Sequence, residues 1–411
     1  MLFQKQIPSN NIYSIEDRLK QRSYACSSPF HKIVNFIAAV AFLIAIHSME
    51  ARLFAQANKD FSVPGRLKVE TIELADIVDK SRVSSESVEP PSRPSRFPRL
   101  RRGSNSAATT TKINERRVPI KVHAPVDGGP YPLIVISHGA GGNWDTHYAQ
   151  AQHFASHGYV VLCIEHVGSN TERLRSGLRL LENVNRMIRD SGEVLGRPKD
   201  ISFAIDQATA WNSSHEKLKG RLDLNHIGML GHSFGAYTTM VVCGMRPALD
   251  WLEPPVAPGK GLGPDVSDAR ISCGIALSPQ GANEPFFIDK SMGSLSKPLM
   301  GISGSEDKQQ GGLPPITRYQ SFSLWPENRG LNKFIWLSNA NHLDFTDSTG
   351  GEQQGIRSAN RDDVQKVVRA ASLMFFDLHL KQEQSTSGKL TTTGLENYLH
   401  GAIESVEVRT K

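Results

Sequence analysis

Runs of almost uninterrupted apolar residues restrict most strongly how this chain of 411 residues can fold. Each run is short enough to be a strand and shows no alternating polar face. Strands of this kind must be buried on both sides, which a parallel sheet between two layers of helices achieves. The sequence therefore predicts the α/β class, with a mostly parallel central sheet flanked by helices on both faces. The predicted strands are YPLIVISHG (131–139), YVVLCIEH (159–166), NHIGML (225–230), ISCGIALS (271–278), KPLMGISG (297–304) and NKFIWLS (332–338).

The segments between these runs carry helical patterns. One of them begins with Pro198, which suits the first turn of a helix. It places four apolar side chains on one face at helical spacing, namely Ile201, Ala204, Ile205 and Ala208. The helices predicted in this way are PKDISFAIDQATAWNS (198–213) and DVQKVVRAASLMFFDLHL (363–380).

Residues 1–57 have the composition of a targeting segment. A basic leader precedes the apolar run IVNFIAAVAFLIAI (33–46), and Ala55 and Ala57 then form an A-x-A-like cleavage site. The run is shorter than the ~20 residues that a membrane span requires, which favours a signal peptide. An uncleaved anchor, or a misassigned start codon ahead of the true signal, is the alternative. Each of these predicts a secreted or periplasmic protein whose only membrane contact is through such an anchor.

A second segment of unusual composition interrupts the predicted strands. Residues 81–112 are dominated by Ser, Pro and Arg and hold almost no apolar residues to bury, so we expect a disordered insertion. The α/β domain is accordingly predicted to span residues 58–385, with residues 386–411 as a C-terminal tail.

The formal net charge of +6 does not indicate a nucleic-acid partner. Residues 1–32 carry a net charge of +3 and residues 81–112 carry +5, so the remaining chain sums to about −2. The predicted domain therefore lacks the basic face that binds phosphate backbones. We expect no nucleic-acid partner.

The cysteines and histidines show no metal-binding spacing. Cys163, Cys243 and Cys273 lie in apolar runs, where buried structural thiols are expected. No H-E-x-x-H or paired C-x-x-C motif occurs, and GKGLG (259–263) lacks the Lys-Ser/Thr of a phosphate-binding loop. The sequence therefore predicts neither a metal site nor a cofactor.

GHSFG (231–235) is a G-x-S-x-G motif that follows a predicted strand and precedes a helical segment. A nucleophilic serine of this kind sits on a sharp strand-to-helix turn, which leaves no room for side chains beside it. Gly231 and Gly235 meet that requirement. Ser233 is therefore the predicted nucleophile, at the start of a helix whose N–H groups can stabilise negative charge.

A carbonyl oxygen that becomes an anion during the reaction needs two N–H donors. One is expected from the backbone of Phe234, directly after the nucleophile. The other is expected from the turn HGAGG (138–142), at Ala140, because this turn follows an earlier predicted strand.

The serine needs a base, and the base needs a carboxylate that holds its tautomer. His342 follows the last predicted strand, which is where the chain order Ser, acid, His requires the base. The turn after the preceding strand offers two acids; we favour Asp307, with Glu306 as the alternative. Asp344 is too near His342 along the chain to be its natural partner.

Together these motifs resemble the α/β-hydrolase superfamily and, within it, the bacterial relatives of platelet-activating factor acetylhydrolase, often labelled predicted dienelactone hydrolases. The resemblance covers roughly residues 66–385. It implies Ser233 and His342 as nucleophile and base, and Ala140 and Phe234 as the oxyanion donors. The segments that carry it are VPIKVHAP, PLIVISHGAGG, SHGYVVLCIEHVGSN, RPKDISFAID, IGMLGHSFGAYT, GIALSPQG and NANHLDF.

One position departs from this family. The animal acetylhydrolases that the chain resembles place their acid directly after the strand that matches GIALS, whereas this chain has Ser278-Pro279-Gln280 there. The departure supports Asp307, after the next strand, as the acid.

The predicted function is hydrolysis of a carboxylic ester, such as a lipid or short-acyl ester, through this triad and an acyl-enzyme. The same triad can cleave amides, so a peptidase or amidase is one alternative, and a non-catalytic binding protein with this fold is another. Segments 168–197 and 249–270 are expected to shape the substrate pocket, with an amphipathic helix at 171–188 as a lid.

Overall fold

The computed structural model of the chain describes Ala38 and residues 59–83, 115–176, 179–283, 285–308, 313–347, 360–399, 401 and 403–411. The chain divides into two compact units, Met1–Lys59 and Asp60–Lys411, and the second carries every strand described below. Apart from Ala38, the predicted signal peptide or anchor (1–57) lies outside the described residues, as does most of the predicted insertion (81–112). Within the described ranges, no helix is long and apolar enough to cross a membrane.

Nine strands form the main sheet, and two more form a small separate one. The strands are β1 (Val69–Leu74), β2 (Val78–Val83), β3 (Glu115–Arg117), β4 (Ile120–Pro125), β5 (Tyr131–Ser137), β6 (Val160–Ile164), β7 (Leu222–His232), β8 (Ile271–Leu277), β9 (Leu299–Glu306), β10 (Lys333–Asn341) and β11 (Val406–Thr410). The main sheet has the order β1-β4-β6-β5-β7-β8-β9-β10-β11, and β2 pairs with β3.

The centre of the main sheet is parallel. The strands from β6 to β10 in this order pair in parallel, whereas β1, β4 and β11 make antiparallel pairs at the two edges. Neighbouring parallel strands need long crossover connections, which here are helical. The predicted α/β-hydrolase fold with a mostly parallel sheet is confirmed.

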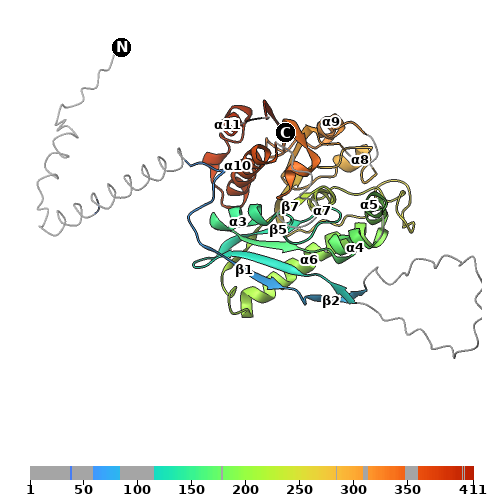
Figure 1. The fold of residues 1–411 in the computed structure, drawn as a ribbon, viewed down its shortest axis with the longest axis horizontal. Helices are drawn as coiled ribbons and strands as arrows, with labels where there is room; N and C mark the ends of the chain where they lie inside the picture. Colours follow the sequence, from blue (N-terminus) through green and yellow to red (C-terminus); the bar gives the residue numbers. More distant parts are fainter. Residues whose placement is uncertain are drawn as a thin grey trace, which may run out of the picture. The chain divides into compact units, whose positions relative to one another are not determined.

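Helices cover both faces of the sheet. The helices are α3 (Tyr148–Ser156), α4 (Thr171–Arg175), α5 (Leu180–Arg189), α6 (Ser191–Ser214), α7 (Phe234–Val242), α8 (Asp289–Met292), α9 (Ile316–Ser321), α10 (Arg361–Leu380) and α11 (Thr392–Glu396). α3 and α10 lie on one side of the strands, and α6 lies on the other (Figure 1). Side chains of β5 alternate accordingly, since Leu133 and Val135 share a buried cluster with α6 and α7, while Ile134 and Ile136 share one with α3 and α10.

The C-terminal segment belongs to the main sheet, so the predicted domain boundary at residue 385 is wrong. β11 pairs antiparallel with β10, and Phe334 lies opposite Arg409. Leu390, Leu395 and Val406 are buried in the same cluster as α10. The sequence of β11, VEVRT, contains no apolar run, because an edge strand exposes one side to solvent and can carry charged residues there.

The helix predicted to begin at Pro198 begins seven residues earlier, at Ser191. The Asp190 carboxylate caps it by accepting hydrogen bonds from Gly192 N (2.8 Å) and Glu193 N (3.3 Å). Pro198 lies inside this helix and has no N–H for the carbonyl of Val194. The Tyr237 hydroxyl donates to that carbonyl instead, at 3.1 Å, so the helix accommodates the proline through a tertiary contact.

The predicted lid segment (171–188) is not one helix, because α4 ends at Arg175 and α5 begins at Leu180. The Asn170 side chain starts α4 by accepting a hydrogen bond from Arg173 N at 3.0 Å. At the end of α4, Ser176 donates to the Arg173 carbonyl both from its backbone N (3.3 Å) and from its Oγ (2.8 Å). Two short helices therefore stand where one was predicted.

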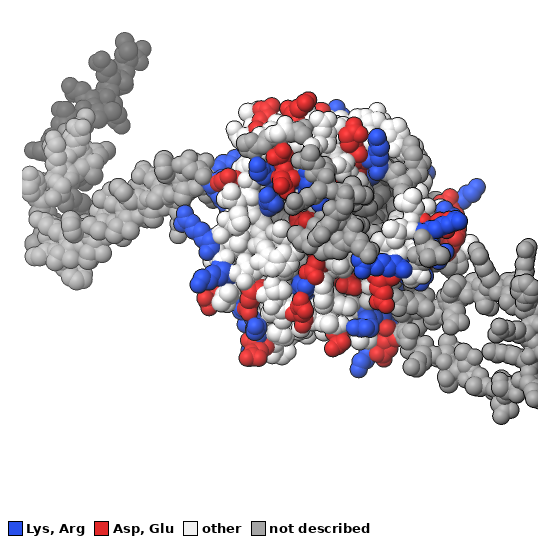
Figure 2. Space-filling model, viewed as in Figure 1, with Lys and Arg blue, Asp and Glu red and all other residues white. Residues whose placement is uncertain are grey.

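The described surface carries charges of both signs. On the face seen in Figure 2, Lys and Arg side chains lie among Asp and Glu side chains. The exposed Arg189, for example, has its Nη2 2.8 Å from an oxygen of the exposed Glu253. Opposite charges this close largely cancel at longer range.

Candidate active site

Ser233 occupies a sharp turn between β7, which ends at His232, and α7, which begins at Phe234. Its backbone has φ 55° and ψ −115°, a conformation that an ordinary residue adopts only when its surroundings impose it. A Cβ on Gly231 would lie 2.1 Å from the Gly235 carbonyl oxygen, and a Cβ on Gly235 would lie 1.9 Å from the Ser137 carbonyl oxygen. Only glycine fits at both positions, as the motif predicted.

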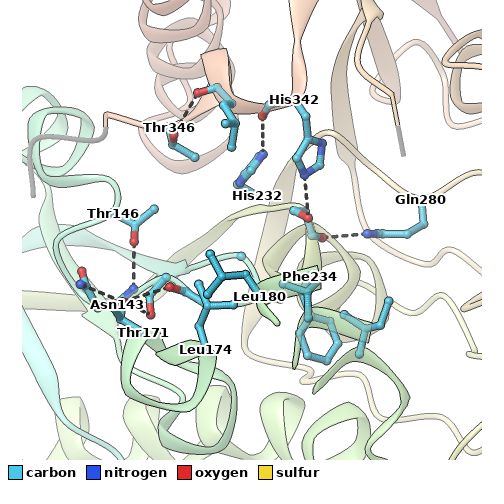
Figure 3. A pocket seen from close by; sticks show the side chains of 18 of the residues that line it. Asn143, Thr146, Thr171, Leu174, Leu180, His232, Phe234, Gln280, His342 and Thr346 are labelled. Atoms are coloured by element: carbon cyan, nitrogen blue, oxygen red, sulfur yellow. Dashed lines mark hydrogen bonds between the residues drawn. The ribbon is translucent and has the colours of Figure 1, made fainter. Parts of the chain in front are cut away.

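His342 lies at the end of β10 and begins a short 3-10 helix, His342–Phe345. Its Nε2 is 3.0 Å from Ser233 Oγ, within hydrogen-bond distance (Figure 3). The carbonyl of His342 accepts a hydrogen bond from Nε2 of His232 at 2.9 Å. Burial lowers the pKa of His232 well below its usual value, so that ring stays neutral and donates. The residue beside the nucleophile therefore holds the predicted base in place.

Asp307 lies directly after β9 and is fully buried. Its Oδ1 is 2.7 Å from Nδ1 of His342, and its Oδ2 accepts a hydrogen bond from the Ser303 hydroxyl at 2.7 Å. Glu306 is half exposed instead, and its carboxylate lies 3.5 Å from Nζ of Lys308. Of the two acids that the sequence offered, the structure brings only Asp307 to the histidine.

Arg318, which the sequence analysis did not single out, accompanies the buried acid. Its Nη2 lies 3.5 Å from Asp307 Oδ1, and its Nη1 donates to the carbonyls of Ser278 (2.9 Å) and Pro279 (2.6 Å). Burial alone would raise the pKa of Asp307. The charge of Arg318 and the hydrogen bonds from His342 and Ser303 outweigh burial and hold that pKa well below its usual range. Asp307 is therefore ionised at neutral pH.

The two predicted oxyanion donors face the same space as the serine hydroxyl, since Ala140, Ser233 and Phe234 all line one cavity. Phe234 is the first residue of α7, so its N–H has no partner within the helix. In the part of the chain that the structure describes, the Ala140 N–H has no hydrogen-bond partner either. The next two residues are engaged, because Gly141 N donates to Ser169 O (2.8 Å) and Gly142 N donates to Gly139 O (3.1 Å). Ala140 and Phe234 therefore remain available to a bound oxyanion.

The cavity in front of Ser233 has a volume of about 400 Å³. One side is apolar and comes mainly from α4 and α5; Figure 3 shows Leu174 and Leu180 among the side chains that surround it. Besides Ala140 and Phe234, the apolar lining residues are Leu174, Leu180, Val184, Ile188, Phe286 and Leu343, and the polar ones include Asn143, Thr146 and Thr171. Of the two segments expected to shape the pocket, 168–197 does so. Segment 249–270 contributes no lining residue; Trp251 only supports Phe286 from behind, with ring centroids 4.8 Å apart.

The three cysteines of the domain are free and buried, as expected for structural thiols. Burial raises the pKa values of Cys163 and Cys243, which keeps both thiols protonated. Among the residues that the structure describes, no cluster of His, Cys, Asp or Glu has the arrangement of a metal site.

Comparison with known proteins gives consistent matches. The family described as "Platelet-activating factor acetylhydrolase, isoform II" matches residues 98–173. The platelet-activating factor acetylhydrolase of Cavia porcellus is 24% identical in an alignment of 298 residues that covers 64% of this chain and 61% of the relative. That of Canis lupus familiaris is 28% identical over 62% of this chain and 58% of the relative, and that of Bos taurus is 23% identical over the same shares. The chain is thus similar to the platelet-activating factor acetylhydrolase isoform II family over these residues.

The chain spans about six tenths of the length of these acetylhydrolases. The matches concern animal acetylhydrolases, and the narrower resemblance to bacterial and dienelactone hydrolase relatives stays a prediction.

The departure from the animal acetylhydrolases has a structural counterpart at the end of β8. Ser278 begins the segment that the sequence analysis matched to the acid of those enzymes. It has φ 52° and a buried side chain. The guanidinium of Arg318 donates to the carbonyls of Ser278 and Pro279 and reaches from there to Asp307. Gln280, two residues further on, donates from Nε2 to the carbonyl of Ser233 at 2.8 Å. This strand end thus supports the nucleophile and the acid without supplying a carboxylate.

Proposed function

We propose that this protein is a serine hydrolase that cleaves carboxylic esters through an acyl-enzyme. The observation that carries the proposal is the continuous chain of hydrogen-bond contacts from Ser233 through His342 to the buried Asp307, at the edge of a cavity. Similarity to a family of acetylhydrolases supports the same class of reaction.

In the first half of the proposed reaction, Ser233 Oγ attacks the ester carbonyl while its proton moves to Nε2 of His342. Asp307 accepts the Nδ1–H of His342, which fixes the tautomer and stabilises the imidazolium that forms. The carbonyl oxygen becomes an anion and is held by the N–H groups of Ala140 and Phe234. The bond to the leaving alcohol then breaks, and His342 returns the proton to the departing oxygen.

In the second half, a water molecule takes the place of the alcohol. His342 accepts a proton from this water, whose oxygen attacks the acyl carbon. The bond to Ser233 Oγ breaks, the proton returns to the serine oxygen, and the carboxylic acid leaves.

The proposed substrate is a lipid ester or a short-acyl ester. The apolar side chains of α4 and α5 offer a surface for a hydrocarbon chain, and polar groups such as Asn143 and Thr171 also line the cavity. The relatives named as platelet-activating factor acetylhydrolases support this choice of substrate class.

The test is labelling by a fluorophosphonate probe together with hydrolysis of nitrophenyl esters and peptide anilides. We expect the wild type to be labelled and to hydrolyse esters in preference to anilides, and Ser233→Ala to do neither. Ser278→Ala, which removes a nearby buried hydroxyl at the end of the neighbouring strand, is the matched control and should keep both properties. An unlabelled wild type, or equal labelling of Ser233→Ala, would overturn the proposal. Preferential cleavage of anilides would establish an amidase instead.

We also propose that the protein is exported, as a secreted or periplasmic enzyme. The support is the order of basic leader, apolar run and A-x-A-like site in residues 1–57. N-terminal sequencing of the protein recovered from outside the cytoplasm should find a new terminus just after Ala57. A product confined to the cytoplasm with its original terminus would refute export.

A further inference from the structure

A group of buried charged side chains lies outside the cavity, behind the turn that carries Ala140. α6 places Glu193, Arg197 and Asp200 at helical spacing, and all three are fully buried. Arg116, from β3, joins them. Burying charges is unfavourable unless each one is paired or hydrogen bonded, so their contacts determine what this group does.

Arg116 neutralises the two carboxylates directly. Its Nη1 lies 2.6 Å from Glu193 Oε1, and its Nη2 lies 2.7 Å from Asp200 Oδ2. Its contacts stay within the charged group, and it touches neither the turn nor Phe234 in the described part of the chain. Its role is to satisfy the acids.

Arg197 makes a different set of contacts, to neutral oxygens. Its Nε donates to Thr238 Oγ1 (3.2 Å), its Nη1 to Ser169 Oγ (3.0 Å), and its Nη2 to Ser137 Oγ (3.2 Å) and to the carbonyl of His138. Among the described residues, none of its hydrogen-bond partners is a carboxylate. The hydrogen bonds of the guanidinium therefore reach the negative charges only through other side chains.

Two hydrogen-bonded connections link Arg197 to the acids. Ser169 Oγ donates to Glu193 Oε2 at 2.8 Å. Ser137 Oγ lies 2.9 Å from Nε2 of His166, whose Nδ1 lies 2.8 Å from Asp200 Oδ2. Burial lowers the pKa of Arg197 to about 9, and the charges of the two acids oppose that shift, so the side chain carries its charge at neutral pH.

Arg197 contacts both parts of the predicted oxyanion hole. The His138 carbonyl that it binds lies two residues before Ala140, in the same turn. Its Cζ also lies 4.3 Å from the centre of the Phe234 ring, and Phe234 supplies the second N–H. One rigid, planar cation thus fixes a backbone group of the first donor's turn and the side chain of the second donor.

We propose that Arg197 is a positioning residue for the oxyanion hole. It holds the His138 carbonyl and the Phe234 ring so that the N–H groups of Ala140 and Phe234 converge on one point, and it adds a fixed positive charge behind them. Preorganised donors and charges of this kind stabilise an oxyanion without reorganisation during the reaction. The inference rests on the proposed ester hydrolysis.

The experiment compares Arg197→Lys and Arg197→Met with Arg116→Lys, a matched control that perturbs an equally buried arginine of the same charged group. Lysine keeps the charge but cannot span four oxygens or lie flat on a ring. We expect kcat to fall about 10–100-fold in Arg197→Lys and about 10²–10³-fold in Arg197→Met, the range seen when an oxyanion donor is lost. KM should stay within about threefold, because the lost interactions act on the transition state. Arg116→Lys should keep kcat within about threefold of wild type, even if its thermal midpoint falls as much as that of the Arg197 variants.

A trifluoromethyl ketone separates positioning from general loosening, because Ser233 adds to it and forms a tetrahedral oxyanion. Its affinity should fall by the same factor as kcat/KM in the Arg197 variants and stay unchanged in Arg116→Lys. The inference fails if folded Arg197 variants keep kcat within threefold, if the loss appears only in KM, or if Arg116→Lys loses as much. Should Arg197→Met not fold, Arg197→Lys alone decides. A wild type that is unlabelled by fluorophosphonate would refute the proposed function itself, whereas active Arg197 variants would refute only this inference.

Discussion

The two walls of the cavity differ in burial and in charge. The catalytic wall consists of the turn at 139–142, the turn at 232–234 and His342, backed by the buried Asp307 and the buried charges of α6. The helical wall consists of the cavity-lining residues of α4 and α5. α4 buries no residue, α5 buries only Asn183 and Met187, and Leu180 is 56% exposed.

This difference separates chemistry from selection of the substrate. On the catalytic wall, each reacting side chain makes at least one buried or partly buried hydrogen-bond contact, and removing one partner leaves another polar group unsatisfied. On the helical wall, side chains meet solvent on one side and can be exchanged at small cost. We therefore expect substitutions on the catalytic wall to change kcat and stability, and substitutions on the helical wall to change which esters are accepted.

The largest expected effect distinguishes the two acids beside His342. Asp307→Asn should lower kcat about 10⁴-fold, because an amide cannot hold the imidazole in its reactive tautomer. Glu306→Gln, one residue away and half exposed, should stay within about twofold. Steady-state hydrolysis of a nitrophenyl ester measures both. Equal losses of kcat in the two variants would show that the hydrogen-bond contact to His342 does not identify Asp307 as the catalytic acid.

A smaller effect is expected from replacing Arg318. Of the proposed triad, this side chain contacts only Asp307. Arg318→Met leaves the buried carboxylate of Asp307 without its cation, and the free energy of unfolding should fall by about 3–5 kcal/mol. Chemical denaturation measures the change, with Arg318→Lys as the variant that keeps the charge and should lose less.

The pH dependence of that loss gives an independent check. In the wild type the folded-state pKa of Asp307 is lowered, so its ionisation contributes stability above about pH 4 and the contribution disappears as the pH falls through the folded-state pKa. Without Arg318 that pKa rises and the contribution shrinks. The difference in unfolding free energy between wild type and Arg318→Met should therefore be largest above about pH 4 and diminish below it. A difference that is constant with pH would mean that Arg318 stabilises the fold only through the two carbonyls.

The smallest effects are expected on the helical wall. Val184→Ala and Ile188→Ala should change unfolding free energy by less than about 1 kcal/mol, because both side chains are only partly buried. They should alter the dependence of kcat/KM on ester chain length severalfold while leaving acetate esters nearly unaffected. Leu181→Ala is the control, since Leu181 is 68% exposed and does not line the cavity. A uniform loss of kcat across all esters would mean that Val184 and Ile188 affect catalysis and not the choice of ester.

Positions along the sequence were enough to predict the groups of the catalytic wall. Ser233, Asp307 and His342 each follow a parallel strand, and the carboxyl ends of parallel strands meet at one edge of the sheet. The glycines around Ser233 revealed the sharp turn because only glycine fits there. The helical wall could be placed near the cavity, but the sequence pattern did not reveal that α4 ends at Arg175 and α5 begins at Leu180.

One signal of the buried charges was present in the sequence. Glu193, Arg197 and Asp200 continue, at helical spacing, the apolar stripe that includes Ile201 and Ala204. Charged residues on the buried face of a helix must find partners inside the protein. The pattern thus pointed to buried charges, although it did not reveal which groups they contact.

The sequence by itself determined the fold class and singled out the proposed nucleophile, the proposed base and the strand end that carries the proposed acid, because these follow from local patterns and chain order. Only the tertiary structure decided between Asp307 and Glu306, brought Arg318 to the acid, paired β11 with β10, and placed Arg197 behind the oxyanion turn. Each of these depends on contacts between residues far apart in the chain, whose geometry no local pattern encodes. For that reason, the residues that carry the chemistry could be read along the chain, and those that position them could not.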